Sequence, residues 1–337
     1  MSLTKVSYSM IQGATANVLD YGADPTGVAD STAAFTAALA TGKKVWIPNG
    51  TYSAADIVLP SYRSIEGEDR HYVNLNVRTS GAAFFTYTGC NEVTMSNFTA
   101  RADSGVTNAR FIRQTDLTAY TAYCTFTNIE TGRELLYSYD GFFIFTTWQF
   151  CRDGYRGNPP ATHVFIKSIP GTTSQVASTN ICQVLQCQVF GAEGALGAIY
   201  LEFGYDWVIR DTDFEANNTN AIRALGIRGL SFDGCWFERN VVGTIIYCAN
   251  SRAPNAQGTF LSVANSLYQA DSSNTIFAEF SGASFGGITN LTAASIPSSC
   301  VLTNASSLTE KYNINAFSGA GATTFATMPA YRNEIQF

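Results

Sequence analysis

Hydrophobic and polar residues alternate along most of the chain, and one stretch of this alternation occurs twice. Residues 207–217 read WVIRDTDFEAN, and residues 230–240 read LSFDGCWFERN. A shift of 23 residues superposes the two copies and aligns three identical pairs: Phe214 with Phe237, Glu215 with Glu238, and Asn217 with Asn240. Alternation with period 2 is typical of β-strands, and a repeat of this length is typical of a solenoid. We therefore predict an all-β fold, a right-handed, single-stranded parallel β-helix.

Fainter copies of the repeat extend toward the N-terminus. Each copy has one position, here called a slot, that is equivalent to Phe214 and Phe237. The pattern assigns four further residues to this slot: Phe98, Phe126, Phe150 and Val189. Residues 156–180 are rich in Pro, Gly, Ser and Thr and are interpreted as an insertion. A β-sandwich is the alternative fold, but it does not require aligned near-copies.

The alternation also predicts which side chains face solvent, because neighbouring residues of a strand point to opposite faces. If Phe214 and Phe237 fill the core, the slot two positions earlier is also inward. We assign five residues to that slot: Cys124, Trp148, Cys187, Thr212 and Cys235. Four residues then face outward: Asp213, Glu215, Trp236 and Glu238. Stacked coils lie about 4.8 Å apart, so carboxylates in register on adjacent coils perturb each other's pKa.

The start of the chain predicts a cap for the open end of the solenoid. Residues 32–40 are rich in Ala and predict a helix, with Asp30 or Ser31 as its N-cap and Gly42 closing it. Strands are predicted at residues 18–21 and 44–47. An amphipathic helix in this position covers the core and strand edges that a solenoid would otherwise expose.

Composition narrows the function classes. The chain has 337 residues, 46% of them hydrophobic, and a net charge of −6, which argues against a nucleic-acid partner. No apolar run is long enough to span a membrane, and the start lacks the apolar core of a signal peptide. The 8 Cys show no zinc-site spacing and are expected to be free thiols. The 2 His, His71 and His163, are far apart in sequence, so we expect no metal site and no cofactor.

Three motifs near the N-terminus carry a family resemblance. The motifs are NVLDYGADPTGVADSTAAF (residues 17–35), KVWIPNGTY (44–52) and SIEGE (64–68). Together they resemble the opening of the pectate-lyase-like β-helix family, most closely its branch in bacteriophage tailspikes and capsule depolymerases. Residues 5–14, KVSYSMIQGA, are similar to the lead-in of this module in phage tail proteins. The resemblance implies a homotrimer in the phage virion tail, made in the host cytoplasm, that binds a bacterial surface polysaccharide and usually cleaves it.

The resemblance transfers no catalytic residue, since these differ between tailspikes. The large N-terminal virion-binding domain and C-terminal trimerisation domain of tailspikes have no counterpart, so we expect a fragment or a subunit that docks on another phage tail protein. We divide the chain into an N-terminal arm (1–16), a capped β-helix (17–274), and terminal coils with a C-terminal trimer contact (275–337).

Catalytic residues are predicted from the outward carboxylates, because glycoside hydrolysis usually uses two carboxyl groups, one protonated and one ionised. Glu215 and Glu238 are the predicted acid and base or nucleophile, and Asp213 is the third carboxylate. The alternative is that Phe-Glu-x-Asn is only a coil-turn motif. Another acid set lies on earlier coils: Glu130, Glu134 and Asp140.

Substrate-binding residues are predicted around the same coils. Trp236 faces outward between the acids and suits stacking on a sugar ring, although a trimer contact would also explain it. Two further pairs, each sharing an outward slot one coil apart, are candidates for contacts to sugar hydroxyls or acidic sugars: Tyr200 with Arg223, and Tyr205 with Arg228. Solvated surface residues are the alternative.

The sequence therefore predicts an endo-glycosidase that depolymerises a capsule or O-antigen polysaccharide. A polysaccharide lyase on the same fold is one alternative, and it would need a base and a group that neutralises a uronate. A receptor-binding spike without catalytic activity is the other.

Overall fold

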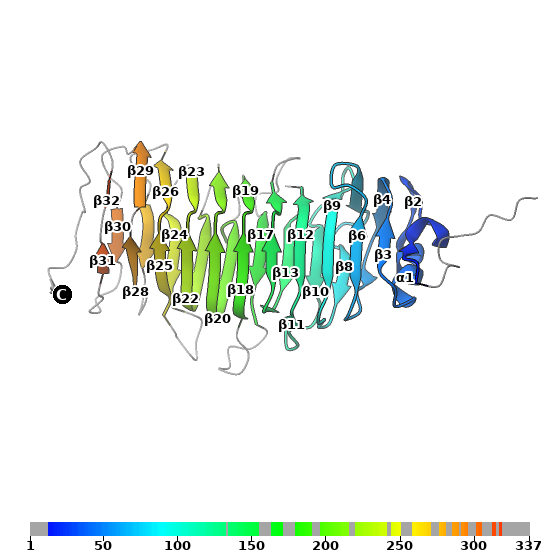
Figure 1. Ribbon diagram of the computed structural model, residues 1–337, viewed down its shortest axis with the longest axis horizontal. Helices are drawn as coiled ribbons and strands as arrows, with labels where there is room; N and C mark the ends of the chain where they lie inside the picture. The colour runs from blue at the N-terminus through cyan, green and yellow to red at the C-terminus, as the bar shows by residue number, and fades with distance from the viewer. Residues whose placement is uncertain are drawn as a thin grey trace, which may run out of the picture.

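The computed structural model is a parallel β-solenoid, which confirms the predicted fold class. It describes the following residues: 13–132, 134–154, 163–170, 179–190, 196–215, 220–240, 244–250, 258–270, 276–280, 285–289, 291–295, 301–304, 312–314 and 317–318. The strands stack along the long axis of the molecule, with the helix α1 (Thr32–Ala40) at the N-terminal end (Figure 1). In each coil the chain passes through three parallel ladders, here numbered 1 to 3.

Ladder 1 runs the length of the solenoid and is continuous in its pairing. It contains β1 (Ala16–Asn17), β3 (Val45–Ile47), β6 (Ser64–Gly67), the first parts of β9 (Thr94–Ala102) and β12 (Thr125–Thr131), β15 (Thr147–Gln149), the last parts of β18 (Thr179–Leu185), β20 (Ile199–Arg210) and β22 (Ile222–Asp233), β25 (Phe260–Ala264), β28 (Phe285–Thr289) and β31 (Tyr312–Ile314).

Ladder 2 follows ladder 1 in every coil and carries the predicted acids. It contains β2 (Thr26–Asp30), β4 (Gly50–Ala54), β7 (Val73–Val77), the last parts of β9 and β12, β16 (Arg152–Asp153), β19 (Gln188–Phe190), β21 (Asp213–Glu215), β23 (Trp236–Asn240), β26 (Leu267–Ala270), β29 (Leu291–Ser295) and β32 (Phe317–Ser318).

Ladder 3 closes each coil. It contains β5 (Ile57–Val58), β8 (Ala83–Tyr87), β10 (Arg110–Gln114), β13 (Tyr137–Gly141), β17 (Val164–Ser168), the first parts of β20 and β22, β24 (Thr244–Ala249), β27 (Ile276–Phe280) and β30 (Val301–Asn304). A short separate pair, β11 (Thr121–Ala122) and β14 (Phe143–Ile144), lies before ladder 1. Because β17 belongs to ladder 3, the predicted insertion at 156–180 contains a regular strand.

The near-copies lie in the predicted register. Phe214 pairs with Phe237, and their buried rings stack with centroids 5.3 Å apart. The upstream halves also pair as aligned, with Ile199 opposite Ile222 and Ile209 opposite Phe232. Asn217 lies outside the described residues, so the third aligned pair is not observed. The next coil departs from the 23-residue shift by one residue, because Ile222 pairs with Ile246 and not with Ile245.

The register predicted for the earlier coils is wrong. The slot of Phe214 continues toward the N-terminus through Val189, as predicted, and then through Asp153, Thr131 and Ala100. Phe126 instead pairs with Trp148 on ladder 1, and Phe98 pairs with Ile129 on the far side of a corner. Phe150 lies at a corner with its side chain 47% exposed. The prediction required a large apolar residue in every coil, whereas in these coils the slot holds an aspartate, a threonine and an alanine.

The second inward slot is likewise only partly as predicted. All five assigned residues are buried, but Trp148 and Cys124 are not in the column of Thr212 and Cys235. Cys151 takes that place. The Gln188 amide donates to the Cys151 carbonyl, just as the Asp213 amide donates to the Cys187 carbonyl and the Trp236 amide to the Thr212 carbonyl. The cysteines among the described residues are free and buried, as predicted.

In the coils from β9 to β26 the chain turns from ladder 1 to ladder 2 through one residue in the left-handed conformation. The corner positions are Asn97, Asn128, Phe150, Gln186, Asp211, Gly234 and Asn265. Asn, Asp and Gly adopt this conformation at little cost. The Asn128 Nδ2 also donates to Asn97 Oδ1 over 2.8 Å, so these side chains link neighbouring coils.

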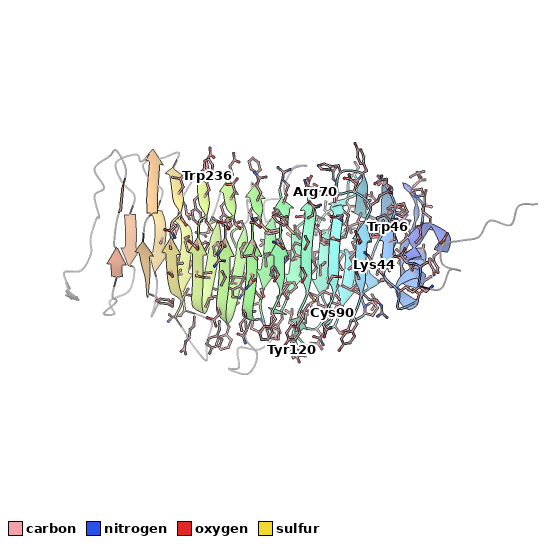
Figure 2. The ribbon with its side chains drawn as sticks, in the orientation of Figure 1. Lys44, Trp46, Arg70, Cys90, Tyr120 and Trp236 are labelled. Carbon is pink, nitrogen blue, oxygen red and sulfur yellow. The ribbon has the colours of Figure 1, made fainter. Side chains whose placement is uncertain are left out.

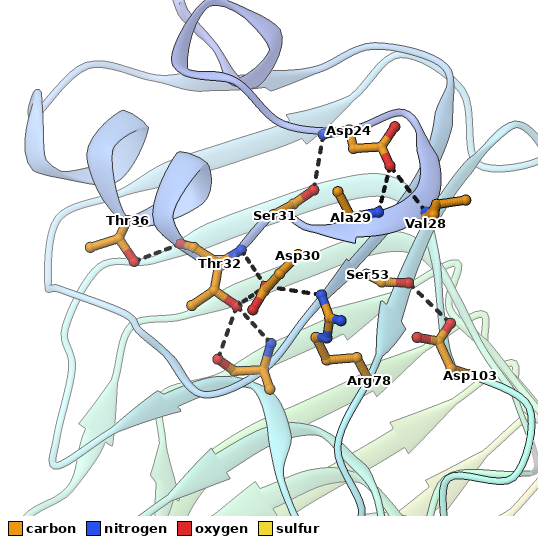
Figure 3. Close-up of polar contacts among 11 residues, drawn as sticks. Asp24, Val28, Ala29, Asp30, Ser31, Thr32, Thr36, Ser53, Arg78 and Asp103 are labelled. Atoms are coloured by element: carbon orange, nitrogen blue, oxygen red, sulfur yellow. Dashed lines mark hydrogen bonds and ion pairs between the residues drawn. The ribbon is translucent and has the colours of Figure 1, made fainter.

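The N-terminal cap is ordered by two aspartates (Figure 3). Asp24 Oδ2 accepts hydrogen bonds from the backbone amides of Val28 and Ala29, at 3.0 and 2.7 Å. These bonds, together with those from Thr26, lower the pKa of Asp24 to about 2. Ser31 is the N-cap residue of α1 but makes no side-chain capping bond. Asp30, one residue earlier, accepts from the Thr32 amide through Oδ1 and so binds the first amide of the helix.

Other expectations concern the two ends of the chain. Residues Val18–Tyr21 form a 3-10 helix, η2, and not a strand, because Asn17 Oδ1 accepts from the Leu19 amide and Gly22 closes the turn. Strands β27 to β32 continue the ladders beyond residue 274. The trimer contact expected there stays a prediction, and residues 1–12 of the expected arm lie outside the described residues. Among the described helices, none has the length and apolar character needed to cross a bilayer.

Candidate active site

The three predicted acids come together on the outer face of ladder 2. Glu215 pairs directly with Glu238 across strands β21 and β23, and Asp213 precedes Glu215 by two residues on the same face. Paired residues of adjacent strands are about 4.8 Å apart along the hydrogen-bonding direction. All three carboxyl side chains are half-buried, while Phe214 and Phe237 between them point into the core. The core aromatics thus fix the strand faces, and the acids lie in register above them.

Asp213 differs from an ordinary surface aspartate. Burial, together with the charges of Glu215 and Glu238, raises the pKa of Asp213 to about 6, against a hydrogen bond from Gln188 that lowers it. A carboxyl group with this pKa is partly protonated near neutral pH. It therefore has the property that a general acid needs, next to two other carboxyl groups. The sequence ranked Asp213 third because burial could not be estimated from it.

Two further polar residues reach this group from the preceding coils. Gln188 pairs with Asp213 in the ladder, and its Nε2 donates to Asp213 Oδ2 over 3.3 Å. Arg152 pairs with Gln188, and its Nε and Nη2 donate to Gln188 Oε1 over 3.0 and 2.8 Å. The alignment of Val189 with Phe214 already placed Gln188 beside Asp213. Arg152 was missed because Phe150 was assigned to the slot of Asp153.

Trp236 occupies the next position in the row, paired with Asp213 on one side and Leu267 on the other. Its side chain is 44% exposed and lies along one long edge of the solenoid, whereas Tyr120 lies along the opposite edge (Figure 2). Phe190 pairs with Glu215 in the neighbouring row. Aromatic groups therefore flank the carboxyls on both sides, an arrangement that suits contact with a sugar face.

Tyr200 and Arg223 pair with each other as predicted, but on ladder 3. Tyr200 is only 3% exposed, and its hydroxyl lies 3.3 Å from Glu202 Oε2. The Arg223 guanidinium lies over the Tyr247 ring, 5.0 Å from its centroid. Both residues are therefore on the outer face of ladder 3, and Tyr200 is buried there.

Tyr205 and Arg228 also pair as predicted. They lie in the part of β20 and β22 that passes from ladder 3 to ladder 1, next to Asp206, whose φ is 53°. Arg228 is exposed, and Tyr205 is half-buried. The strand register thus separates both pairs from the ladder that carries the acids, and only Trp236 of the predicted binding residues shares that ladder.

The alternative acid set does not form one group. Glu130 is on the outer face of ladder 2, in register with Arg152, and is buried. Burial raises the pKa of Glu134, which follows β12. Asp140 lies on ladder 3, where Arg110 and Lys167 bind its two carboxyl oxygens at 3.2 and 3.0 Å. Asp140 is therefore bound by two cations and lies on a different ladder from Glu130.

No group of three or more His, Cys, Asp or Glu in the described ranges is arranged to hold a metal ion. The two histidines lie apart, as expected: His71 pairs with Asp69 at the surface, and His163 is buried against Asp153. The polar groups around Asp213 are the carboxyl groups of Glu215 and Glu238, the amide of Gln188 and the guanidinium of Arg152, with aromatic rings on both sides.

Comparison with known proteins places the chain in a family. The model for rhamnogalacturonase A/epimerase, pectate lyase-like, matches residues 15–245, which is more than half of the chain. The chain belongs to this family. No curated protein matches it in sequence.

Solved structures with the same fold include phage and bacterial surface proteins. The tailspike protein of Acinetobacter phage vB_ApiP_P1 matches with a TM-score of 0.61 and 15% identity, over 92% of this chain and 54% of the tailspike chain. The Streptococcus pneumoniae surface adhesin PfbA matches with a TM-score of 0.61 and 14% identity, over 90% and 82% of the two chains. The Acinetobacter phage vb_AbaP_AS12 gp42 tailspike gives 0.57 and 12%, over 94% and 66%.

These likenesses confirm the resemblance to tailspikes at the level of the fold. The chain spans about half the length of the first of these tailspikes. At identities of 12–15% the likeness concerns the fold.

Proposed function

We propose that this chain binds a bacterial surface polysaccharide, a capsule or an O-antigen, along the outer face of ladder 2 and hydrolyses its glycosidic bonds. The observation that carries the proposal is the group of Asp213, Glu215 and Glu238, in register on adjacent strands and containing one carboxyl with a pKa of about 6. Hydrolysis of a glycoside needs a protonated and an ionised carboxyl group at the same bond. This group supplies both near neutral pH.

We assign the role of general acid to Asp213, because its burial favours the protonated form. Asp213 gives its proton to the leaving glycosidic oxygen and becomes a carboxylate. Glu215 and Glu238 are the candidates for the second carboxyl, which acts as the base on water or as the nucleophile. Trp236 is the candidate platform for a sugar ring beside the acid.

The biological setting is proposed from the family and the fold. Tailspikes among the structural matches, and the phage-like lead-in of the sequence, support a subunit of a phage virion tail that acts on the host surface. A homotrimer and docking on another tail protein belong to the same proposal. A glycan that extends beyond ladder 2 is proposed to contact four further residues: Tyr200, Arg223, Tyr205 and Arg228.

Isolated host capsule and lipopolysaccharide, incubated with the purified chain, test the proposal. New reducing ends and the ultraviolet absorbance of unsaturated sugars are followed together. We expect reducing ends without absorbance, and Asp213→Asn should lower the rate by about 10²- to 10⁴-fold. Asp233→Asn is the matched control, because this half-buried residue lies on ladder 1 and should leave the rate unchanged.

Other outcomes are distinct. Reducing ends with ultraviolet absorbance would identify a lyase, and the acid group would lose its assigned role. Binding to the host polysaccharide without either signal would identify a receptor-binding spike. Full activity in the Asp213→Asn variant would reject Asp213 as the acid and leave the fold assignment intact.

A further inference from the structure

The row of side chains that leads to Asp213 has hydrogen bonds of fixed direction. A guanidinium group only donates hydrogen bonds, so the atom of Gln188 that faces Arg152 must be its amide oxygen. Both Arg152 donors reach this oxygen, at 3.0 and 2.8 Å. The amide nitrogen of Gln188 is therefore turned toward Asp213, where it lies 3.3 Å from Oδ2. Arg152 thus removes the ambiguity that normally surrounds the orientation of a glutamine amide.

The two oxygens of Asp213 are consequently not equivalent. Oδ2 faces an N–H group and must accept. Oδ1 is buried and has no hydrogen-bond partner among the described residues. When Asp213 is neutral, a proton on Oδ2 would conflict with the Gln188 donor, so the proton is on Oδ1.

We propose that Arg152 and Gln188 are positioning residues, which fix the oxygen of Asp213 that accepts a hydrogen bond and the oxygen that carries the proton. Their part in catalysis rests on the function proposed above, whereas their effect on Asp213 does not. When Asp213 ionises, the Oδ1–H bond breaks and the proton leaves the carboxyl group. The resulting carboxylate keeps the Gln188 hydrogen bond on Oδ2.

Besides fixing the proton position, Gln188 affects the pKa of Asp213. Burial, Glu215 and Glu238 favour the neutral form, and the Gln188 hydrogen bond favours the carboxylate. Gln188 therefore counteracts part of the rise in pKa and keeps it near 6, where the group can both release and regain a proton at neutral pH. If Gln188 is lost, the neutral form becomes more stable.

The test is a carbon NMR titration of aspartate side-chain carboxyls in the intact chain, with the Asp213 signal identified by its absence in Asp213→Asn. We expect Gln188→Leu to move the Asp213 midpoint upward by about one pH unit, since a hydrogen bond to a charged group is lost. Arg152→Met should move it in the same direction by less, because Gln188 stays but is no longer held in place. Gln149→Leu is the matched control, a half-buried glutamine on ladder 1, and should leave the midpoint unchanged.

The outcomes separate this proposal from the proposed function. An unchanged midpoint in both Gln188→Leu and Arg152→Met, in folded protein, would overturn the positioning role whatever the activity. If the midpoint moves, the fall in hydrolysis rate at high pH should move upward with it, because the acid stays protonated to a higher pH. A moved midpoint with an unmoved pH–rate profile would support the positioning role and reject Asp213 as the catalytic acid.

Discussion

Two stretches of ladder 2 differ in the residues that fill the inward slot, which are aromatic in one stretch and polar in the other. At β21 and β23 the inward slot holds Phe214 and Phe237, whose rings stack at 5.3 Å, while the outward slots hold carboxyls. At β12 and β16 the inward slot holds Thr131 and Asp153, both fully buried. A solenoid therefore does not need an apolar residue in every inward position. It needs each buried polar group to be paired.

The pairing around Asp153 is complete. Its Oδ1 accepts from Thr131 Oγ1 and Ser138 Oγ at 2.5 and 2.8 Å, and its Oδ2 lies 2.8 Å from His163 Nε2. The other ring nitrogen of His163 lies 2.5 Å from the carbonyl oxygen of Leu135. A carboxylate and a carbonyl oxygen both accept, so both ring nitrogens carry a proton and His163 is charged. The core at β16 thus contains an ion pair.

The largest expected effect comes from breaking this pair. Asp153→Ala leaves the buried His163 and two hydroxyls without their acceptor and should lower the free energy of unfolding by about 3–5 kcal/mol. Chemical denaturation followed by circular dichroism measures the change. The double variant Asp153→Leu with His163→Leu removes both charges and should be more stable than Asp153→Ala. Equal stability of Asp153→Ala and the unmodified chain would show that the pair is not formed.

A smaller effect is expected from pH. The charge of Asp153 and its hydrogen bond, with the Leu135 carbonyl and Glu134, raise the pKa of His163 against the opposing effect of burial. A raised pKa in the folded state means that the stabilisation is complete below the unfolded value of about 6.5 and is lost as pH rises through the folded value. We expect the unfolding midpoint to fall over this interval in the unmodified chain. The fall should be absent in the double variant, and its persistence there would assign it to another group.

The smallest effect is expected at the corner between ladders 1 and 2. Phe150 has φ of 54° and is 47% exposed, so it is strained and solvated at a position where most other coils place Asn, Asp or Gly. Phe150→Asn should raise the free energy of unfolding by about 1 kcal/mol, whereas Asn128→Phe should lower it by a similar amount. Thermal unfolding of both variants measures the difference. A loss of stability in Phe150→Asn would mean that the Phe150 ring makes contacts that outweigh the strain.

The strand register could be predicted from the sequence in one of these stretches and not in the other. The register at Phe214 and Phe237 was predictable, because stacked aromatics repeat visibly and fix the carboxyls on the opposite face. The register at Asp153 was not, because its partners Ser138 and His163 come from neighbouring strands and turns and leave no periodic signal. The error then propagated outward: with Phe150 in the wrong slot, Arg152 was not recognised as part of the site.

The roles within the site were also beyond the sequence. Asp213, Glu215 and Glu238 were found because alternation and register place them together. Which of them holds a proton depends on burial, and burial depends on neighbours such as Trp236, Phe190 and Gln188. Tyr200 and Arg223 were correctly paired, but periodicity alone could not show that they belong to ladder 3, since the corners between ladders were not identified.

The central claim is that the carboxyl group on ladder 2 is where the polysaccharide is cut. The most direct test is a crystal structure of the Asp213→Asn variant with an oligosaccharide from the host capsule or O-antigen. We expect a sugar ring against Trp236 and a glycosidic oxygen within hydrogen-bond distance of the residue 213 side chain. An oligosaccharide bound along ladder 1 or ladder 3, with the outer face of ladder 2 empty, would contradict it.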